Sequence, residues 1–223
     1  MNLILRLLRV FIAAFFRSKL TFKDESVVSF RVWFHDLDIN SHMTNSRYLA
    51  VMDLGRTDLL IRTGLGRIVM KNRWSPVLAS TSIRWRKSLL LFQKYTVHTR
   101  LASWDEKWFY LDQKVVRNNR VVAHALQKAI FVGKEGAVHT QKVIDLYEDH
   151  AGPIDQSELD RDMARKTAED LEQQGQKNES VSKSLNDENR NENAPIPDSF
   201  SLWQISEESM RQDIQAYEET LKK

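Results

Sequence analysis

The sequence predicts an α+β domain in which one long central helix packs on a curved antiparallel sheet. Three observations carry this prediction: an early run of β-branched and aromatic residues, a helical stripe directly after it, and four β-like segments joined by short connections. β-branched and aromatic side chains favour strands. Short connections between consecutive strands imply antiparallel pairing.

The first strand is predicted over residues 26–34, SVVSFRVWF, and the helix from about Asn45 to Arg62, with Thr44 or Asn45 as its N-cap. A glycine inside a helix costs about 1 kcal/mol relative to alanine. We therefore expect Gly55 to let the helix approach the sheet closely. The residues spaced to share one face of this helix are Tyr48, Met52, Gly55 and Leu59.

Four further strands are predicted at residues 76–88, 94–104, 107–117 and 120–132. The second of them alternates apolar and polar residues, as a strand with one buried face does. A strand, a helix and then an antiparallel meander is the element order of the hotdog fold. A sheet this small leaves an edge exposed, so we expect a homodimer.

Composition narrows the class of protein. The chain of 223 residues has no Cys, which excludes disulfides, Cys-ligated zinc, iron–sulfur clusters and a Cys nucleophile. Residues 1–150 carry 24 Lys and Arg against 13 Asp and Glu, whereas the rest of the chain is acidic. A basic body suggests a polyanionic partner, such as nucleic acid, anionic lipid or coenzyme A. Since no nucleic-acid-binding motif is present, we expect no nucleic-acid partner.

The first 22 residues are predicted to form an amphipathic helix. Their longest charge-free stretch is shorter than the roughly 20 apolar residues that span a bilayer, and the arginines suit an anionic membrane surface. We expect a cytoplasmic protein that is peripheral on a membrane. A helix packed on the protein's own core or on a partner, or a signal anchor, are the alternatives. The predicted apolar stripe is Leu3, Leu7, Val10 and Ala14.

The remaining boundaries follow from changes in composition. Residues 23–150 form the predicted domain, and residues 151–194 form a charged linker that is partly helical or disordered. The chain regains apolar residues over 195–223, which we interpret as a tail that docks on the domain.

A polar run, DLDINSHMTNSRY, spans residues 36–48 between the first strand and the helix. A metal site is one interpretation, but ligands this close together at a strand end cannot easily converge, and we expect no metal or other cofactor. A structural interpretation has Asp38 and Asn40 forming Asx-turns, with a cap at the helix start. The candidate metal ligands would be His35, Asp36, Asp38 and His42.

The third interpretation is acyl transfer from a thioester. Asp38 would act as general base or nucleophile, while Asn40 and His42 orient the reacting groups. The helix that follows has free backbone N–H groups, which can stabilise an oxyanion. The groups in question belong to Asn45, Ser46 and Arg47.

This run resembles known families. It matches the D-x-D-x-x-x-H-x-x-N-x-x-Y segment of hotdog thioesterases of the 4-hydroxybenzoyl-CoA type, and even more closely the D-L-D-x-N-x-H-V-N-N segment of plant acyl-ACP thioesterases. The resemblance implies that Asp38 is catalytic and that Asn40 and His42 assist it, leaving Asp36 as a structural member. Ser41 departs from the Gly of many bacterial relatives, and Thr44 from the usual Asn.

Further segments, including RYLAVMDLGR and the Trp-containing tail, resemble thioesterase superfamily member 6-like proteins. The resemblance implies a fatty-acyl-CoA or acyl-ACP thioesterase, or alternatively a non-catalytic membrane-associated acyl-CoA-binding or scaffold protein. Asp53 could complete the site or be a solvated carboxylate. Tyr48 is expected to contact substrate, and the candidates for the coenzyme A phosphates are Arg84, Arg86 and Lys87, which could instead protect a strand edge.

Overall fold

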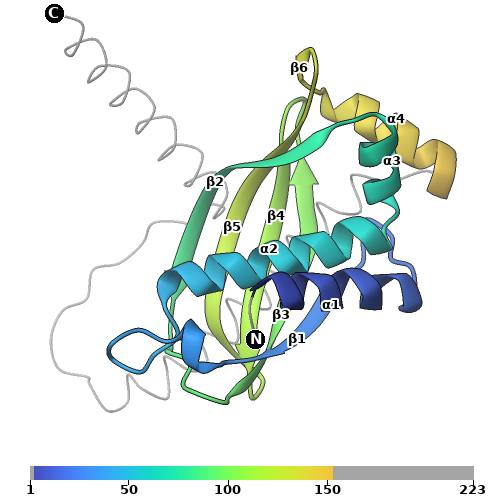
Figure 1. The fold of residues 1–223 in the computed structure, drawn as a ribbon. Coiled ribbons are helices and arrows are strands. Elements are labelled where there is room, and N and C mark those ends of the chain that lie inside the picture. The colour runs from blue at the N-terminus through green and yellow to red at the C-terminus, as the bar shows by residue number, and fades with distance from the viewer. Residues whose placement is uncertain (1–2, 153–223) are drawn as a thin grey trace, which may run out of the picture. The chain divides into compact units, whose positions relative to one another are not determined.

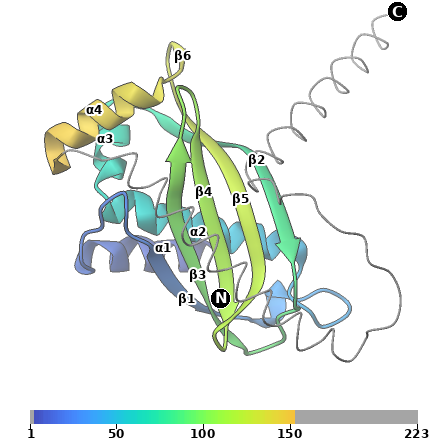
Figure 2. The ribbon, with the colours of Figure 1, turned by 180° about the vertical axis from the view of Figure 1, so that it is seen from behind.

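The computed structural model describes residues 3–152, in which helices cover one face of a single antiparallel sheet (Figure 1). Seen from behind, the strands face the viewer and the helices lie beyond them (Figure 2). The elements in chain order are α1 Leu3–Phe16, β1 Ser26–Arg31, the 3₁₀ turn η1 Phe34–Asp36, α2 Asn45–Arg62, α3 Leu65–Lys71, β2 Ser75–Trp85, β3 Lys94–Trp104, β4 Phe109–Arg117, β5 Arg120–Gly133, β6 Gly136–Ala137 and α4 Thr140–Ala151.

The strands pair in the order β1-β3-β4-β5-β2, with β6 added to β5, and every pairing is antiparallel. The central helix α2 lies across this sheet and has the bounds predicted from its periodicity. The predicted hotdog architecture is thereby confirmed.

Three predicted strands are shorter than expected, and one of them, β2, spans Ser75–Trp85 where residues 76–88 were expected. β1 stops at Arg31 because the chain turns into η1, where the carboxylate of Asp36 accepts the Trp33 N–H at 2.9 Å. β4 begins at Phe109 because the Asp105 carboxylate accepts the N–H groups of Lys107 and Trp108 and closes a turn there. In both places a local carboxylate replaces ladder hydrogen bonds.

Two helices were not predicted. α3 follows α2 across Gly64, whose φ of +84° is open to glycine at little cost, so the TGLG signal marks a turn between helices. α4 packs through Tyr147, which stacks on Phe22 with ring centroids 4.0 Å apart. The predicted linker and docking tail lie outside the described residues, apart from the end of α4.

Gly55 allows the close approach that its position predicted. A Cβ atom there would lie 2.5 Å from Thr99 Oγ1 and 3.0 Å from Val97 Cγ1, both on β3. Any larger residue would push α2 off the sheet. The centre of α2 is therefore fixed against β3 at van der Waals distance.

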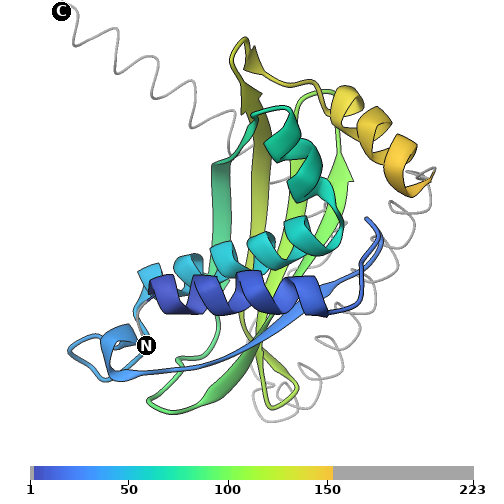
Figure 3. The ribbon, with the colours of Figure 1, turned by 45° about the vertical axis from the view of Figure 1, so that its right-hand side comes forward.

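Helix α1 runs beside α2 on the same side of the sheet (Figure 3). It buries Arg6, Val10 and Ala14. The predicted stripe is wrong at Leu7, which is exposed, because the helix turns its arginines toward the domain. The interpretation in which α1 packs on the protein's own core is confirmed for this inner face.

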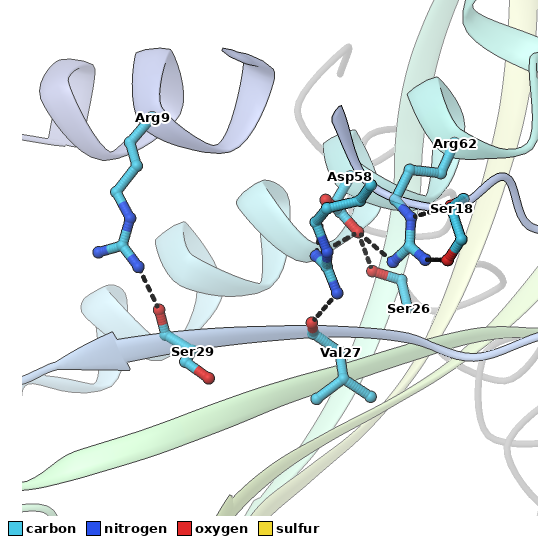
Figure 4. A network of polar contacts seen from close by, with 8 residues as sticks. Arg9, Ser18, Ser26, Val27, Ser29, Asp58 and Arg62 are labelled. Atoms are coloured by element: carbon cyan, nitrogen blue, oxygen red, sulfur yellow. Dashed lines mark hydrogen bonds and ion pairs between the residues drawn. The ribbon is translucent and has the colours of Figure 1, made fainter. Parts of the chain in front are cut away.

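The α1 segment closes the free edge of β1 with arginine side chains. Carbonyl oxygens of alternate β1 residues accept from three arginines: Arg31 from Arg6 at 3.2 Å, Ser29 from Arg9 at 3.5 Å, and Val27 from Arg17 at 2.8 Å. Two of these contacts are visible in Figure 4. Because the strand's outward acceptors are occupied, this edge cannot template another strand.

Two of these arginines also form ion pairs. Arg6 is 1% exposed and binds the fully buried Asp36, with Nη1 3.1 Å from Oδ1. Arg17, which is 36% exposed, binds the buried Asp58 on α2 at 3.1 Å. Asp58 also accepts from Ser26 and Arg62 (Figure 4).

Candidate functional site

The turn that precedes α2 is built by the backbone and by one carboxylate. Asp38 N–H donates to the carbonyl of His42 at 2.8 Å, and Asp38 Oδ1 accepts the N–H groups of Asn40 at 2.9 Å and His42 at 3.1 Å. Ser41 has a φ of 59°, in the left-handed region. The Asx-turn expected in the structural interpretation is therefore present.

This structural role leaves part of the predicted site accessible. The second oxygen of Asp38 accepts no hydrogen bond from residues 3–152, and the side chains of Asn40 and His42 are likewise unengaged within that range. Asp38 and Asn40 are exposed, while His42 is half-buried. The turn therefore presents a carboxylate, an amide and an imidazole at the surface.

Asp36, two residues earlier, has the structural role predicted for it. Its carboxylate is held by Arg6 and by the Trp33 N–H, and Arg47 Nε lies 3.5 Å away. Burial lowers the pKa of the adjacent His35. Across residues 3–152 no three His, Asp or Glu side chains gather closely enough to hold a metal ion.

The N-terminus of α2 adjoins this turn. Thr44 is the N-cap in extended conformation, with no side-chain capping hydrogen bond, and Asn45 is the first helical residue. Arg47 N–H already donates to the Thr44 carbonyl at 3.0 Å. Within the described residues the N–H groups of Asn45 and Ser46 have no acceptor, so two of the three predicted oxyanion donors are free to bind a ligand oxygen.

A segment after β2 crosses the same turn, which sequence order alone does not indicate. Met43 N–H donates to the Leu89 carbonyl at 2.8 Å, and His42 forms a bridge with Leu90. The exposed residues Arg86 and Lys87 therefore lie on the segment that joins β2 to this turn. Arg84 lies further back, on β2 itself.

Tyr48, which was predicted to contact substrate, is buried. It is a core residue of α2, and its hydroxyl accepts the Leu89 N–H at 3.2 Å. Burial raises its pKa. Tyr48 thus ties α2 to the segment that carries Lys87, and its contribution to the site is positional.

A separate apolar cavity of about 540 Å³ lies between the C-terminal half of α2, α3 and the sheet. Asp53, the residue that could complete the predicted site, is the one predicted site residue in its described lining. Its charged lining residues are Asp53 and Arg56, one turn apart on α2. Arg56 was not predicted, because an arginine on a helix usually points to solvent. The signal that could have found it is the presence of Gln113 and Gln127 at inward positions of β4 and β5.

The family model described as the Thioesterase-like superfamily matches residues 32–204. Protein THEM6 of Danio rerio is 42% identical over 92 residues, which are 41% of this chain and 46% of that protein. The probable thioesterase YBR096W of Saccharomyces cerevisiae is 28% identical over 103 residues, 45% of this chain and 44% of that protein. The matched segments span less than half of these relatives.

Solved structures share the fold. YbaW, a probable thioesterase from Escherichia coli, superposes with a TM-score of 0.52 at 21% identity, covering 55% of this chain and 95% of that one. SAV2348 from Staphylococcus aureus, solved in complex with CoA, superposes with a TM-score of 0.51 at 13% identity, covering 62% and 92%. These identities establish a common fold and no more.

Proposed function

Because the chain belongs to the Thioesterase-like superfamily, we propose that it hydrolyses fatty-acyl thioesters of coenzyme A or acyl carrier protein. The observation that carries the proposal is the Asp38 turn, where an accessible carboxylate oxygen adjoins an uncapped helix N-terminus. These are the two groups that acyl transfer needs, a base or nucleophile and an oxyanion site.

In the proposed reaction the thioester carbonyl oxygen points to the N–H groups of Asn45 and Ser46. Asp38 accepts a proton from water as the water oxygen attacks the carbonyl carbon, and the negative charge that develops on the carbonyl oxygen is stabilised by the helix N-terminus. Collapse of the intermediate breaks the C–S bond, and the proton returns from Asp38 to the departing thiolate.

Asp38 could instead attack the carbonyl carbon itself, giving an acyl-aspartyl anhydride that water then opens. In either route Asn40 and His42 orient water and the carboxylate from the same turn. Mass spectrometry of protein quenched during turnover distinguishes the routes, since only the anhydride route attaches the acyl group to Asp38.

Arg86 and Lys87 are the proposed partners of the coenzyme A phosphates, with Arg84 as a more distant member. Their support is the Met43 to Leu89 hydrogen bond, which joins their segment to the catalytic turn. The SAV2348 structure contains CoA on the same fold. Replacing both Arg86 and Lys87 with Gln should raise KM for acyl-CoA more than KM for the acyl-pantetheine, which lacks the nucleotide phosphates.

We also propose that two copies pair along β2. Among the described residues this strand pairs only with β5, and it exposes apolar Val77 and Leu78. An edge of this kind is a template for another strand. Val77→Lys should convert a dimer into a monomer in light scattering coupled to size-exclusion chromatography, and a wild-type protein that is already monomeric contradicts the pairing.

Membrane association is proposed on a different basis from the one the sequence suggested. The α1 arginines contact β1, Asp36 and Asp58 and do not form a polar outer face, so the outer face of α1 is apolar. Within residues 3–152 no helix has the length and apolarity to cross a bilayer. The proposed mode is therefore insertion of this face into the cytoplasmic surface of a membrane. Its exposed members are Ile4, Leu5, Leu8, Ile12, Phe15 and Phe16.

Cosedimentation with neutral phosphatidylcholine vesicles tests this proposal. We expect binding that changes little with salt, because the arginine charges are engaged inward, and we expect loss of binding in Leu8→Gln/Phe15→Gln. Arg9→Gln is the matched control on the same helix. Binding only to anionic vesicles, or equal binding by the double variant, contradicts insertion.

The thioesterase proposal is tested by thiol release from a panel of acyl-CoA chain lengths. The chain has no Cys, so a thiol reagent reports the product alone. Asp38→Asn keeps the turn hydrogen bonds and should lower kcat by about 10²- to 10⁴-fold. The exposed Asp145→Asn on α4 is the matched control. Equal activity of wild type and Asp38→Asn rules out the mechanism, and activity in neither leaves the non-catalytic binding protein as the function.

A further inference from the structure

The lining of the apolar cavity beside α2 includes one arginine, Arg56, which has no role in the proposed hydrolysis. Its walls come from α2, α3, β2 and β5, and aliphatic and aromatic side chains predominate in them. Its volume of about 540 Å³ lies within the roughly 300–1,000 Å³ typical of small-molecule sites. The guanidinium of Arg56 lies in this lining, where the side chain is only 16% exposed.

The sheet side fixes the position of Arg56. Arg56 Nη1 donates to Gln113 Oε1 at 3.0 Å and also to Gln127 Oε1. Gln113 is itself oriented, because its Nε2 donates to the Met52 carbonyl at 2.9 Å and to Thr99 Oγ1 at 2.7 Å. Both glutamine side chains are fully buried. On the sheet side the guanidinium is thus held in place by neutral acceptors, and its charge is compensated only from the helix side.

The only carboxylate bound to Arg56 among the described residues is Asp53, whose side chain is 63% exposed. Burial lowers the pKa of Arg56 to about 10. Because Asp53 is mostly exposed, its ion pair with Arg56 is screened by water, and a carboxylate held in the cavity by an apolar chain can compete with it. A carboxylate matches the planar donor fork of arginine.

We propose that this cavity binds a free long-chain fatty acid, with its carboxylate on Arg56 and its chain along the walls contributed by Trp74, Val69 and Phe131. A thioester or alcohol offers Arg56 only a neutral oxygen, so the cavity selects the free acid. The site is distinct from the Asp38 turn and does not depend on whether the chain hydrolyses thioesters. The chemistry of the ligand is that of a hydrolysis product, which would make the cavity a product-retaining or regulatory site.

The test compares a fatty acid with the matched alcohol. Displacement of the fluorescent fatty acid cis-parinaric acid from the full chain gives affinities for palmitate and for hexadecanol. We expect wild type to prefer palmitate by about tenfold or more, as expected for a hydrogen bond to a charged group. Arg56→Met should abolish this preference and still bind hexadecanol, which shows that the cavity is intact.

Two further variants sharpen the test. Asp53→Asn removes the competing carboxylate and should tighten palmitate binding severalfold, whereas Arg67→Met, at an exposed arginine of α3 that does not line the cavity, should change nothing. Equal affinity for acid and alcohol in wild type, an unchanged preference in Arg56→Met, or no binding of either ligand each overturns the proposal. Asp38→Asn should bind palmitate like wild type, so failure of the thioesterase mechanism is separable from failure of this site.

Discussion

The two edge strands of the sheet, β1 and β2, differ in whether their free edges are covered by the rest of the chain. At the β1 edge, carbonyl oxygens of alternate residues accept from Arg6, Arg9 and Arg17, so the edge is closed within the chain. At the β2 edge, apolar side chains are exposed and β5 is the strand's one partner among the described residues. Edge strands invite pairing unless they are covered. The contrast indicates that one edge is closed by α1, while the other is available to a second copy.

The closed edge depends most on Arg6, and its removal gives the largest expected effect. Arg6→Met leaves the buried Asp36 with only the longer arginine contact, to Arg47 at 3.5 Å, which should cost about 3–5 kcal/mol of unfolding free energy in urea titrations. Arg9→Met, at a surface contact, should cost less than about 0.5 kcal/mol. Arg6→Met/Asp36→Asn should recover part of the loss. A double variant as unstable as the single one contradicts the ion pair as the cause.

Asp112, on the central strand β4, provides a comparison because its carboxylate contacts neither of the two edge strands. Asp112 binds Arg100 at 2.7 Å and His124 at 2.7 Å. Burial by itself raises the pKa of Asp112, but the His124 hydrogen bond and the charges of His124 and Arg100 lower it more, so it lies well below its usual range. Asp112→Asn should cost about 2–3 kcal/mol at neutral pH.

The lowered pKa of Asp112 in the folded state determines how the unfolding free energy changes with pH. A carboxylate whose pKa is lower in the folded state stabilises the protein fully above its unfolded pKa of about 3.9. Its contribution is lost as the pH falls from there toward the folded value. The difference between wild type and Asp112→Asn in urea titrations should therefore narrow between about pH 5 and pH 3, and a constant difference would show that the charge is not the cause.

Gly55→Ala tests how tightly α2 packs on β3. The added Cβ would lie 2.5 Å from Thr99 Oγ1, so the helix must move, at a cost of about 1–3 kcal/mol. Thr99→Ala removes the obstructing atom. Measured by thermal or urea unfolding, the double variant should lose less than the sum of the two single losses. Strict additivity would mean that helix propensity, rather than contact with the sheet, sets the cost.

Arg17 should give the smallest effect at the closed edge. It is more than a third exposed, and its partner Asp58 keeps Arg62 and Ser26 when Arg17 is lost (Figure 4). Arg17→Met should therefore cost about 1 kcal/mol or less, and less still at high salt. A loss as large as that of Arg6→Met would show that burial of the ion pair does not determine how much stability each arginine contributes.

The sequence predicted features that depend on local periodicity and local chemistry. The bounds of α2 and β3 follow from residue spacing, and the roles of Gly55 and Asp36 follow from residue type and position. Predictions failed where the deciding partner is distant in the chain. The orientation of α1 depends on Asp36 and Asp58, which lie 30 and 41 residues beyond their arginines.

The same distinction between local and distant partners applies to the candidate site. The Asp38 turn was predictable because a contiguous run carries it. The Arg56 cavity was not, since Gln113 and Gln127 lie 57 and 71 residues from that arginine. Tyr48 was assigned to substrate because its helix begins at the site, and only the fold places its hydroxyl against the backbone of Leu89.

The arginines of α1 also fix the order in which the chain can assemble. Arg6 and Arg17 are synthesised before Asp36 and Asp58, the carboxylates that bind them, and Asp58 belongs to a helix that docks on strands made later still. Closing such distant contacts costs chain entropy before any contact forms. During synthesis α1 is therefore a cationic, apolar helix that still lacks the carboxylates and carbonyl groups it contacts in the folded protein. Its packing against the β1 edge is a late step in folding.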